Sequence, residues 1–160
     1  MTRAFIQAVL DSRRTEAENL LGVVLPIDWP DEGDLRHLQR WHKDMAEENR
    51  VAPWRARAIT LREGGLMIGH AGFHGPPDDT GTIEIGYAIF PPFRGNGYAT
   101  EAARRLLEMA KEIGATTFRA SVSPSNAPSL AVVRKLGLVK TGERMDDVDG
   151  SEFVFERPLG

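Results

Sequence analysis

The chain has 160 residues, with 20 Lys and Arg against 23 Asp and Glu, so its formal net charge at pH 7 is −3. A chain of this length buries roughly 68–70% of the surface that its unfolded form exposes, so we expect a single domain over residues 1–160. The absence of Cys excludes disulfide frameworks, thiolate metal sites and Cys nucleophiles.

Charge and hydropathy exclude two further classes of partner. No stretch approaches the ~20 apolar residues of a membrane span, and the apolar run at the N-terminus is too short for a secretory signal. Nucleic acid is a poor partner for a slightly acidic chain, because neutralising phosphates requires clustered Lys and Arg. The four His have no metal-ligand spacing. We therefore expect a cytoplasmic protein without a metal, a membrane contact or a direct nucleic-acid contact.

The first half of the chain predicts both strands and helices. Residues 3–10 mix Phe, Ile and Val as a strand does, and residues 15–21 have apolar side chains at helical spacing. A second amphipathic helix is predicted over residues 33–48, where apolar side chains recur every three or four positions. Residues 54–62 and 66–73 are predicted strands on either side of a Glu-Gly-Gly turn.

The second half contains the clearest strand and the longest helix. Over residues 82–90, Ile83, Ile85, Tyr87 and Ile89 fall on one face of a strand. Helices are predicted over residues 97–113 and 127–136, and strands over 117–122, 139–148 and 151–157. The last two strands pair across Asp149-Gly150, a strong hairpin signal. This order predicts an α/β fold with a mixed sheet.

The most informative segment is a strand that runs through a glycine-rich turn into the long helix. The first four N–H groups of a helix have no partner within the helix and lie at the positive end of its dipole. A turn of Gly95, Asn96 and Gly97 can therefore enclose an anionic phosphate, and glycine lets the backbone approach it closely.

Two common phosphate motifs do not fit this turn. A nucleotide P-loop needs Gly-Lys-Ser/Thr, whereas Gly97 is followed by Tyr98 and Ala99. A dinucleotide fingerprint needs a third glycine, where this chain has Thr100, and an acidic residue that closes the next strand, which residues 117–122 lack.

The pattern R-x-x-G-x-A at positions 94–99 resembles the acyl-coenzyme A motif of the GNAT superfamily, and Asn126, Ser129 and the Lys-Leu-Gly at 135–137 resemble a second motif of that family. The spellings E-I-G-Y and R-G-N-G-Y-A-T-E-A resemble the branch that acetylates the N-termini of ribosomal proteins. The resemblance implies a mixed, mostly antiparallel sheet of six to seven strands, about four flanking helices, and two splayed parallel strands at its centre.

The resemblance also implies acetyl-coenzyme A as the cosubstrate. Its diphosphate would lie in the turn, and its pantetheine arm between the splayed strands, against the backbone of Ile89 and Phe90. The two prolines after Phe90 remove hydrogen-bond donors, so we expect the strand to leave its neighbour near that point. The cosubstrate contacts so implied are Ile89, Phe90, Arg94, Gly95, Asn96, Gly97, Tyr98, Ala99, Asn126 and Ser129.

The same resemblance suggests the catalytic groups. We expect Glu84 to receive a proton from the incoming ammonium, directly or through water, with the small Gly86 and Ala88 leaving room beside it. A backbone N–H of the same strand would hold the developing oxyanion. Many family members use a Tyr seven positions beyond the motif Asn to protonate the leaving sulfur; this chain has Val133 there, so we expect Ser129 to donate to the sulfur instead.

The acceptor is expected to be a protein or peptide N-terminal amine, contacted by Tyr87 and Trp29, with Trp41 as a second candidate. A small-molecule amine is the alternative acceptor, and a homodimer is left open. Two other functions stay open: a non-catalytic acyl-coenzyme A-binding module and an unrelated nucleotide-binding domain. Structural roles are also open, since Asn126 before Pro128 is typical of a helix start.

Overall fold

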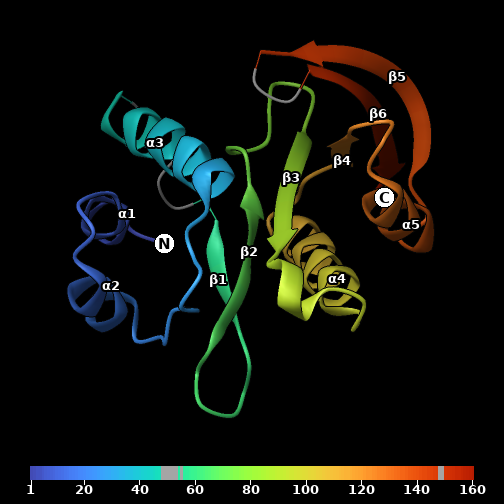
Figure 1. Ribbon diagram of the computed structural model, residues 1–160. Helices are drawn as coiled ribbons and strands as arrows, with labels where there is room; N and C mark the ends of the chain where they lie inside the picture. Colours follow the sequence, from blue (N-terminus) through green and yellow to red (C-terminus); the bar gives the residue numbers. More distant parts are fainter. Residues whose placement is uncertain (48–53, 55, 148–149) are drawn as a thin grey trace.

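One mixed sheet forms the centre of the molecule (Figure 1). The computed structural model describes residues 1–47, 54, 56–147 and 150–160. Within them six strands stand in the order β1-β2-β3-β4-β6-β5, and every neighbouring pair is antiparallel except β3 and β4. Their bounds are β1 Arg57–Thr60, β2 Met67–Phe73, β3 Thr82–Ile89, β4 Thr117–Val122, β5 Val139–Asp146 and β6 Gly150–Pro158.

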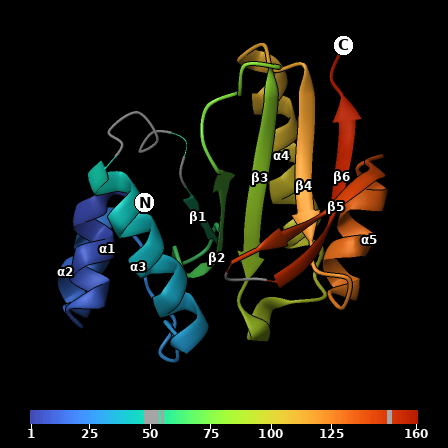
Figure 2. The same ribbon diagram turned by 90° about the horizontal axis from the view of Figure 1, so that it is seen from above.

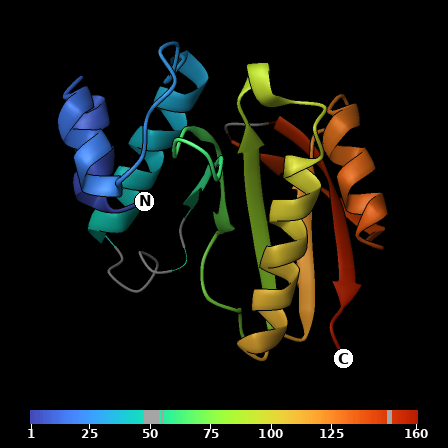
Figure 3. The ribbon, with the colours of Figure 1, turned by 90° about the horizontal axis from the view of Figure 1, so that it is seen from below.

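Helices lie in two separate groups around this sheet. Figures 2 and 3 show α4 across one face of the β3–β4 region, with α5 nearby, while α1, α2 and α3 gather beside β1 and β2. Among the described residues, no helix is long and apolar enough to span a bilayer. The helical bounds are α1 Arg3–Leu10, α2 Arg14–Leu21, α3 Glu32–Glu47, α4 Tyr98–Glu112 and α5 Ala127–Lys135, with a short 3-10 helix η1 at Pro91–Phe93.

The sequence-based prediction of a mixed, mostly antiparallel sheet is confirmed, with six strands. Every predicted strand from residue 54 onward and every predicted helix has its counterpart within a few residues. Three predicted positions lie outside the described residues: the helix end at Glu48, the strand end at Val148, and Asp149 of the hairpin turn.

The strand predicted over residues 3–10 is wrong, because this segment forms helix α1. Phe5, Ile6, Ala8 and Val9 are all buried, and their spacing of one, three and four is that of a helical face. Thr2 caps the helix by accepting a hydrogen bond from the N–H of Phe5 at 3.2 Å. The apolar residues of this segment suit a strand, but the N-cap and the spacing of the buried residues are those of a helix. The structure therefore has five α-helices among the described residues, where about four were expected.

Buried side chains form two cores. The main core lies between the sheet and helices α4 and α5, and includes Ile83, Ile85, Leu106, Phe118 and Val133. The N-terminal core joins α1 and α3 to β2 and the end of β3, through Phe5, Trp29, Leu38, Met67 and Phe90. Strand β3 contributes Ile83, Ile85 and Tyr87 to the main core, and Phe90, directly after its end, packs in the N-terminal core.

The parallel strands β3 and β4 separate part of the way along their length. They pair from Thr82 with Thr117 to Ile85 with Ala120, and β3 then continues to Ile89 paired with β2 alone. The expected divergence is confirmed, but it begins after Ile85, several residues before the prolines at 91 and 92. Strand β4 meanwhile continues to pair with β6 through Val122.

A half-buried histidine in this fold predicts a dependence of stability on pH. His70 on β2 meets the edge of Trp41, with 5.0 Å between ring centroids. Burial, aided by the charges of His37 and the N-terminal ammonium, lowers the pKa of His70 to about 4. The unfolded chain keeps an ordinary imidazole and binds a proton first as the pH falls, so the fold loses stability between pH 6.5 and about 4.

We expect the free energy of unfolding to fall by up to about 3 kcal/mol more across this interval in the wild type than in His70→Gln. Urea unfolding at pH 7, 6, 5 and 4 measures the difference, with His42→Gln as a control that keeps the wild-type slope. Parallel curves for the wild type and His70→Gln would contradict the assignment.

Candidate functional site

The turn between η1 and α4 is built from two glycines in the left-handed region. Gly95 has φ of 80° and Gly97 has φ of 84°. Residues with a Cβ adopt this backbone conformation only at a cost in free energy. Gly97 is the N-cap of α4, and no side chain caps the helix at this end. The first amides of a 15-residue helix therefore face outward from an exposed turn, which suits an anion.

Two side chains brace this turn. The Nε of Arg94 donates to the carbonyl of Ile89 at 2.8 Å, which fastens the turn to the end of β3. The side-chain amide of Asn96 donates to the carbonyls of Phe93 and Arg94, at 3.0 and 3.1 Å. Both contacts use carbonyl acceptors, so they hold the loop while leaving its amide donors available.

Beyond Ile85, one edge of β3 has no strand partner. The N–H of Phe90 donates to Ile68 and the carbonyl of Glu84 accepts from His74, so even-numbered residues of β3 direct their backbone groups toward β2. Backbone groups alternate along a strand, and those of Tyr87 and Ile89 therefore point toward the opening beside β4. Of the two backbones expected to meet the pantetheine arm, Ile89 faces the opening, whereas the N–H of Phe90 is occupied by Ile68.

Helix α5 brings a second group of residues toward the opening. Asn126 is the N-cap of this helix, and its Oδ1 accepts from the N–H of Ser129 at 3.1 Å, which confirms the capping role. Ser129 neighbours the phenol of Tyr87, whose oxygen is buried and makes no hydrogen bond of ordinary geometry within the described residues. Burial raises the pKa of Tyr87, and Ser129 partly opposes this. Val133 is fully buried in the main core.

Glu84 lies on the opposite face of β3, within a charged network. Arg144 of β5 donates to both carboxylate oxygens of Glu84, at 2.8 and 2.9 Å, and its Nε donates to Glu152 at 2.8 Å. The hydroxyl of Ser121 on β4 donates to Glu84 at 2.8 Å. The side chain of Glu84 is 13% exposed, so its carboxylate is fixed by these hydrogen bonds and is not solvated.

His74, directly after the end of β2, also lies on this face. Its Nδ1 lies 3.7 Å from Oε1 of Glu84. Its ring lies over Gly86, where a Cβ would come within 2.8 Å of Nε2. The room expected beside Gly86 is therefore filled by this imidazole. The proximity depends on the register of β2 against β3, in which Phe73 pairs with Ile85, and no local motif signals it.

The tryptophans expected near the acceptor differ in their surroundings. Trp29 is 5% exposed in the N-terminal core, where its ring lies between those of Phe5 and Phe90, with centroids 6.3 and 5.4 Å away. Trp41 of α3 is half-buried beside His70. In Figure 1, α3 and the β5–β6 hairpin stand on either side of β3, and Trp41 belongs to that flanking helix.

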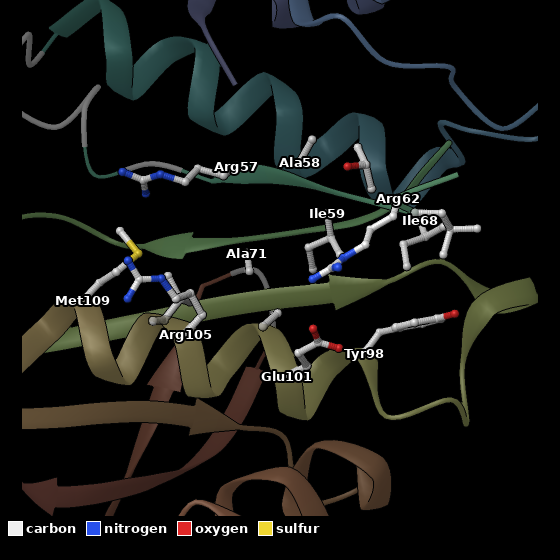
Figure 4. A pocket seen from close by; sticks show the side chains of 14 residues that line it. Arg57, Ala58, Ile59, Arg62, Ile68, Ala71, Tyr98, Glu101, Arg105 and Met109 are labelled. Carbon is white, nitrogen blue, oxygen red and sulfur yellow. The ribbon is translucent and has the colours of Figure 1, made fainter. Parts of the chain in front are cut away.

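A separate cavity of about 450 Å³ lies between β1 and α4 (Figure 4). Ile59, Ile68 and Leu106 give it an apolar wall, and Arg57 and Arg105 lie along its side. Tyr98 and Glu101 also line it, so the cavity extends to the first turn of α4. Across the residues that the structure describes, no group of three or more His, Cys, Asp or Glu is arranged to hold a metal ion.

Comparisons with known proteins agree with this geometry. The model of the Acetyltransferase (GNAT) domain matches residues 7–139. The uncharacterized N-acetyltransferase YnaD of Bacillus subtilis is 35% identical over 85 residues, which are 52% of this chain and 49% of YnaD. This chain therefore matches about half the length of that relative.

Two solved structures share the fold at low identity. A putative ribosomal-protein-serine acetyltransferase from Vibrio cholerae has a TM-score of 0.66 at 15% identity, over 96% of this chain and 89% of that one. A spermidine N-acetyltransferase SpeG chimera from Vibrio cholerae and hSSAT has a TM-score of 0.65 at 11% identity, over 99% and 93%. Proteins named for different acceptors thus share one fold with this chain.

The left-handed turn predicts a stability difference between two glycines. Gly97→Ala forces a Cβ into φ of 84° and is expected to destabilise the free protein by about 1–2 kcal/mol. Gly142→Ala is the matched control, because Gly142 has no left-handed φ and no atom within 4 Å of a built Cβ; its effect is expected to stay within about 0.5 kcal/mol. Urea unfolding measures both, and equal stabilities would show that the turn does not hold this conformation.

Proposed function

The chain belongs to the GNAT acetyltransferase family, and we propose that it transfers an acetyl group from acetyl-coenzyme A to a primary amine by direct attack within a ternary complex. One observation carries this proposal: an uncapped helix start with two left-handed glycines directly follows a strand that has lost its neighbour. We further propose that residues 1–160 act as one cytoplasmic catalytic domain.

The diphosphate of the cosubstrate is assigned to the turn at residues 94–99. The outward amides of Gly95 to Ala99 supply donors at the positive end of α4, and the guanidinium of Arg94 supplies a cation beside them. Two features support this assignment. The loop is exposed and its side chains hydrogen-bond to its carbonyls, so its amide N–H groups remain available, and a diphosphate accepts hydrogen bonds from such groups.

The pantetheine arm is assigned to the opening between β3 and β4. The backbone groups of Tyr87 and the N–H of Ile89 face this opening and suit an extended arm that pairs as an added strand would, while the carbonyl of Ile89 accepts from Arg94. The bound cosubstrate supplies an acetyl thioester. A strand N–H here would stabilise the negative charge that develops on the acetyl oxygen, a kind of contact worth about 2.7–4 kcal/mol in other enzymes.

The acceptor amine is assigned to the Glu84 face of β3. Glu84 supplies a fixed negative charge, and the proton of the incoming ammonium moves toward it, directly or through water. An α-amino group, with a pKa near ~7.7–8.0, loses its proton more readily than an alkylammonium near ~10.4. This difference favours a protein or peptide N-terminus as the acceptor, with Trp41 of the flanking helix α3 proposed as a contact; Tyr87 faces the main core on the other side of β3, and Trp29 is 5% exposed.

Ser129 is assigned to the departing sulfur. Val133 occupies the position where many relatives have a Tyr acid, and its side chain is buried in the main core. The hydroxyl of Ser129 lies at the start of α5 beside the buried phenol of Tyr87, which places two hydroxyl groups near the expected thioester end. A thiolate with an ordinary pKa near ~8.5 needs only modest help from such a donor.

Release of free thiol from acetyl-coenzyme A tests the activity. The purified chain is offered peptides with free N-termini, polyamines and aminoglycosides in parallel, and turnover is expected to be highest with the peptides. A polyamine or an aminoglycoside as the preferred acceptor would instead support the small-molecule alternative. Binding of acetyl-coenzyme A without turnover on any acceptor would favour a non-catalytic binding module, for which the replacement of Tyr by Val133 is the motivating observation.

The diphosphate assignment predicts a ranking of ligands. Coenzyme A is expected to raise the thermal midpoint of unfolding, whereas pantetheine, which lacks phosphate, is expected to have a much smaller effect at equal concentration. ATP serves as the control for a nucleotide site. Equal stabilisation by pantetheine and coenzyme A would contradict a role for the turn.

The Ser129 assignment predicts a loss in kcat. A neutral hydrogen bond contributes about 0.5–1.5 kcal/mol, so Ser129→Ala is expected to lower kcat by about 2- to 12-fold with little change in KM for acetyl-coenzyme A. Ser125→Ala is the control, because its hydroxyl pairs with that of Ser123 in the loop before α5. An unchanged kcat in Ser129→Ala would remove this residue from the mechanism.

A further inference from the structure

We propose that the cavity between β1 and α4 binds a small amphipathic anion: a straight aliphatic chain that ends in a carboxylate. Its volume of about 450 Å³ falls within the range of small-molecule sites, roughly 300–1,000 Å³. This inference goes beyond the acetyltransferase proposal, and its tests do not require turnover.

The edge of the sheet leaves apolar surface beside α4. Helix α4 packs against β2 and β3, and β1 lies beyond them as the outermost strand. Ile68 and Leu106, which line the cavity, are buried, whereas Ile59 and Leu61 are only half-buried. A ligand in the cavity would therefore remove further apolar surface from water, which favours binding.

The shape and lining of the cavity suit an aliphatic chain. Figure 4 shows β1 and α4 alongside each other, with the cavity between them. Its apolar wall is aliphatic, and Tyr98 is the one aromatic side chain among the lining residues. A flat ring or a base is bound best where aromatic faces stack on it, so a straight chain fits this wall better.

The charges around the cavity favour an anion. Figure 4 shows Arg57 and Arg105 toward one end and Arg62 toward the other. Glu101 is the one acidic side chain among the lining residues. Cations therefore outnumber anions around the apolar wall, and a carboxylate can accept charge-assisted hydrogen bonds from a guanidinium.

Arg105 is assigned as the partner of the carboxylate. Its Nη1 pairs with Glu108 at 3.5 Å and Glu112 at 3.0 Å, and neither glutamate lines the cavity. A guanidinium has five N–H donors, so contacts through Nη1 leave those of Nε and Nη2 for a ligand. Both ion pairs are exposed, and such pairs cost little to rearrange. The aliphatic chain would then extend toward Ile68.

Titration of the free protein with octanoate, followed by backbone amide NMR, tests the site. We expect saturable shifts that are largest on Ile59, Ile68 and Leu106. From butanoate through hexanoate to octanoate, Kd is expected to fall by about 4-fold for each added methylene, because each one buries further apolar surface. Octylamine is the control for charge, and it is expected to bind about 10-fold more weakly than octanoate because its ammonium would meet arginines.

Two variants separate the charge from the cavity. Arg105→Gln is expected to raise Kd for octanoate by about 3- to 10-fold, since it removes a charged donor at a partly exposed site. Arg104→Gln is the matched control, because Arg104 is its exposed neighbour on α4 and does not line the cavity. Ala102→Leu keeps every charge but fills part of the cavity, so it is expected to reduce the gain from each methylene. Thermal unfolding confirms that each variant is folded.

The contrary results are equally specific. Largest shifts on Tyr87 and Ile89 would place octanoate in the opening beside β4 and would overturn the proposal, as would octylamine binding as tightly as octanoate. Absence of saturable binding at millimolar octanoate would also overturn it. Sedimentation that shows a dimer weakened by Arg105→Gln, without octanoate binding, would assign this face to a second copy of the chain. None of these results bears on acetyl transfer, which thiol release tests separately.

Discussion

The site depends on the loss of pairing between two parallel strands. From Gly86 onward β3 keeps β2 on one side and loses β4 on the other, so backbone donors and acceptors become available in the middle of a sheet. Such groups are costly to leave without partners unless water or a ligand satisfies them. The fold supports the opening from both sides, because β6 continues to hold β4 and the N-terminal core holds the end of β3.

The strand that borders this opening also separates two chemical environments. On its Tyr87 face lie the start of α4, the start of α5 and the hydroxyl of Ser129, which suit a phosphorylated thioester. On its Glu84 face lies the carboxylate of Glu84, held by Arg144 and Ser121, which suits an amine that must lose a proton. A cosubstrate and an acceptor that enter from opposite faces would meet at the gap, which is consistent with direct transfer.

The sequence predicted those parts of the molecule that depend on neighbouring residues. Gly95, Asn96 and Gly97 predicted a turn between the strand and the long helix, and the alternation of Ile83, Ile85 and Ile89 predicted the central strand. The first helix was mistaken for a strand, because its short run of apolar residues suits either structure and only the Thr2 cap and the burial of one face decide between them.

The charged network could not be predicted in this way. Arg144 lies 60 residues from Glu84 in the chain, and His74 reaches Glu84 only through the register of β2. Packing of this kind depends on the whole sheet, so a local motif identifies Glu84 without revealing which groups hold it. For the same reason, proteins that share the fold carry names for different acceptors.

Backbone amide NMR during a titration with coenzyme A tests the central claim most directly, because it reports on every described segment at once. The account predicts that the largest shifts fall on Tyr87, Ile89 and residues 95–99, on either side of the separation between β3 and β4. Shifts confined to the cavity between β1 and α4, lined by Ile59, Ile68 and Leu106, would contradict it.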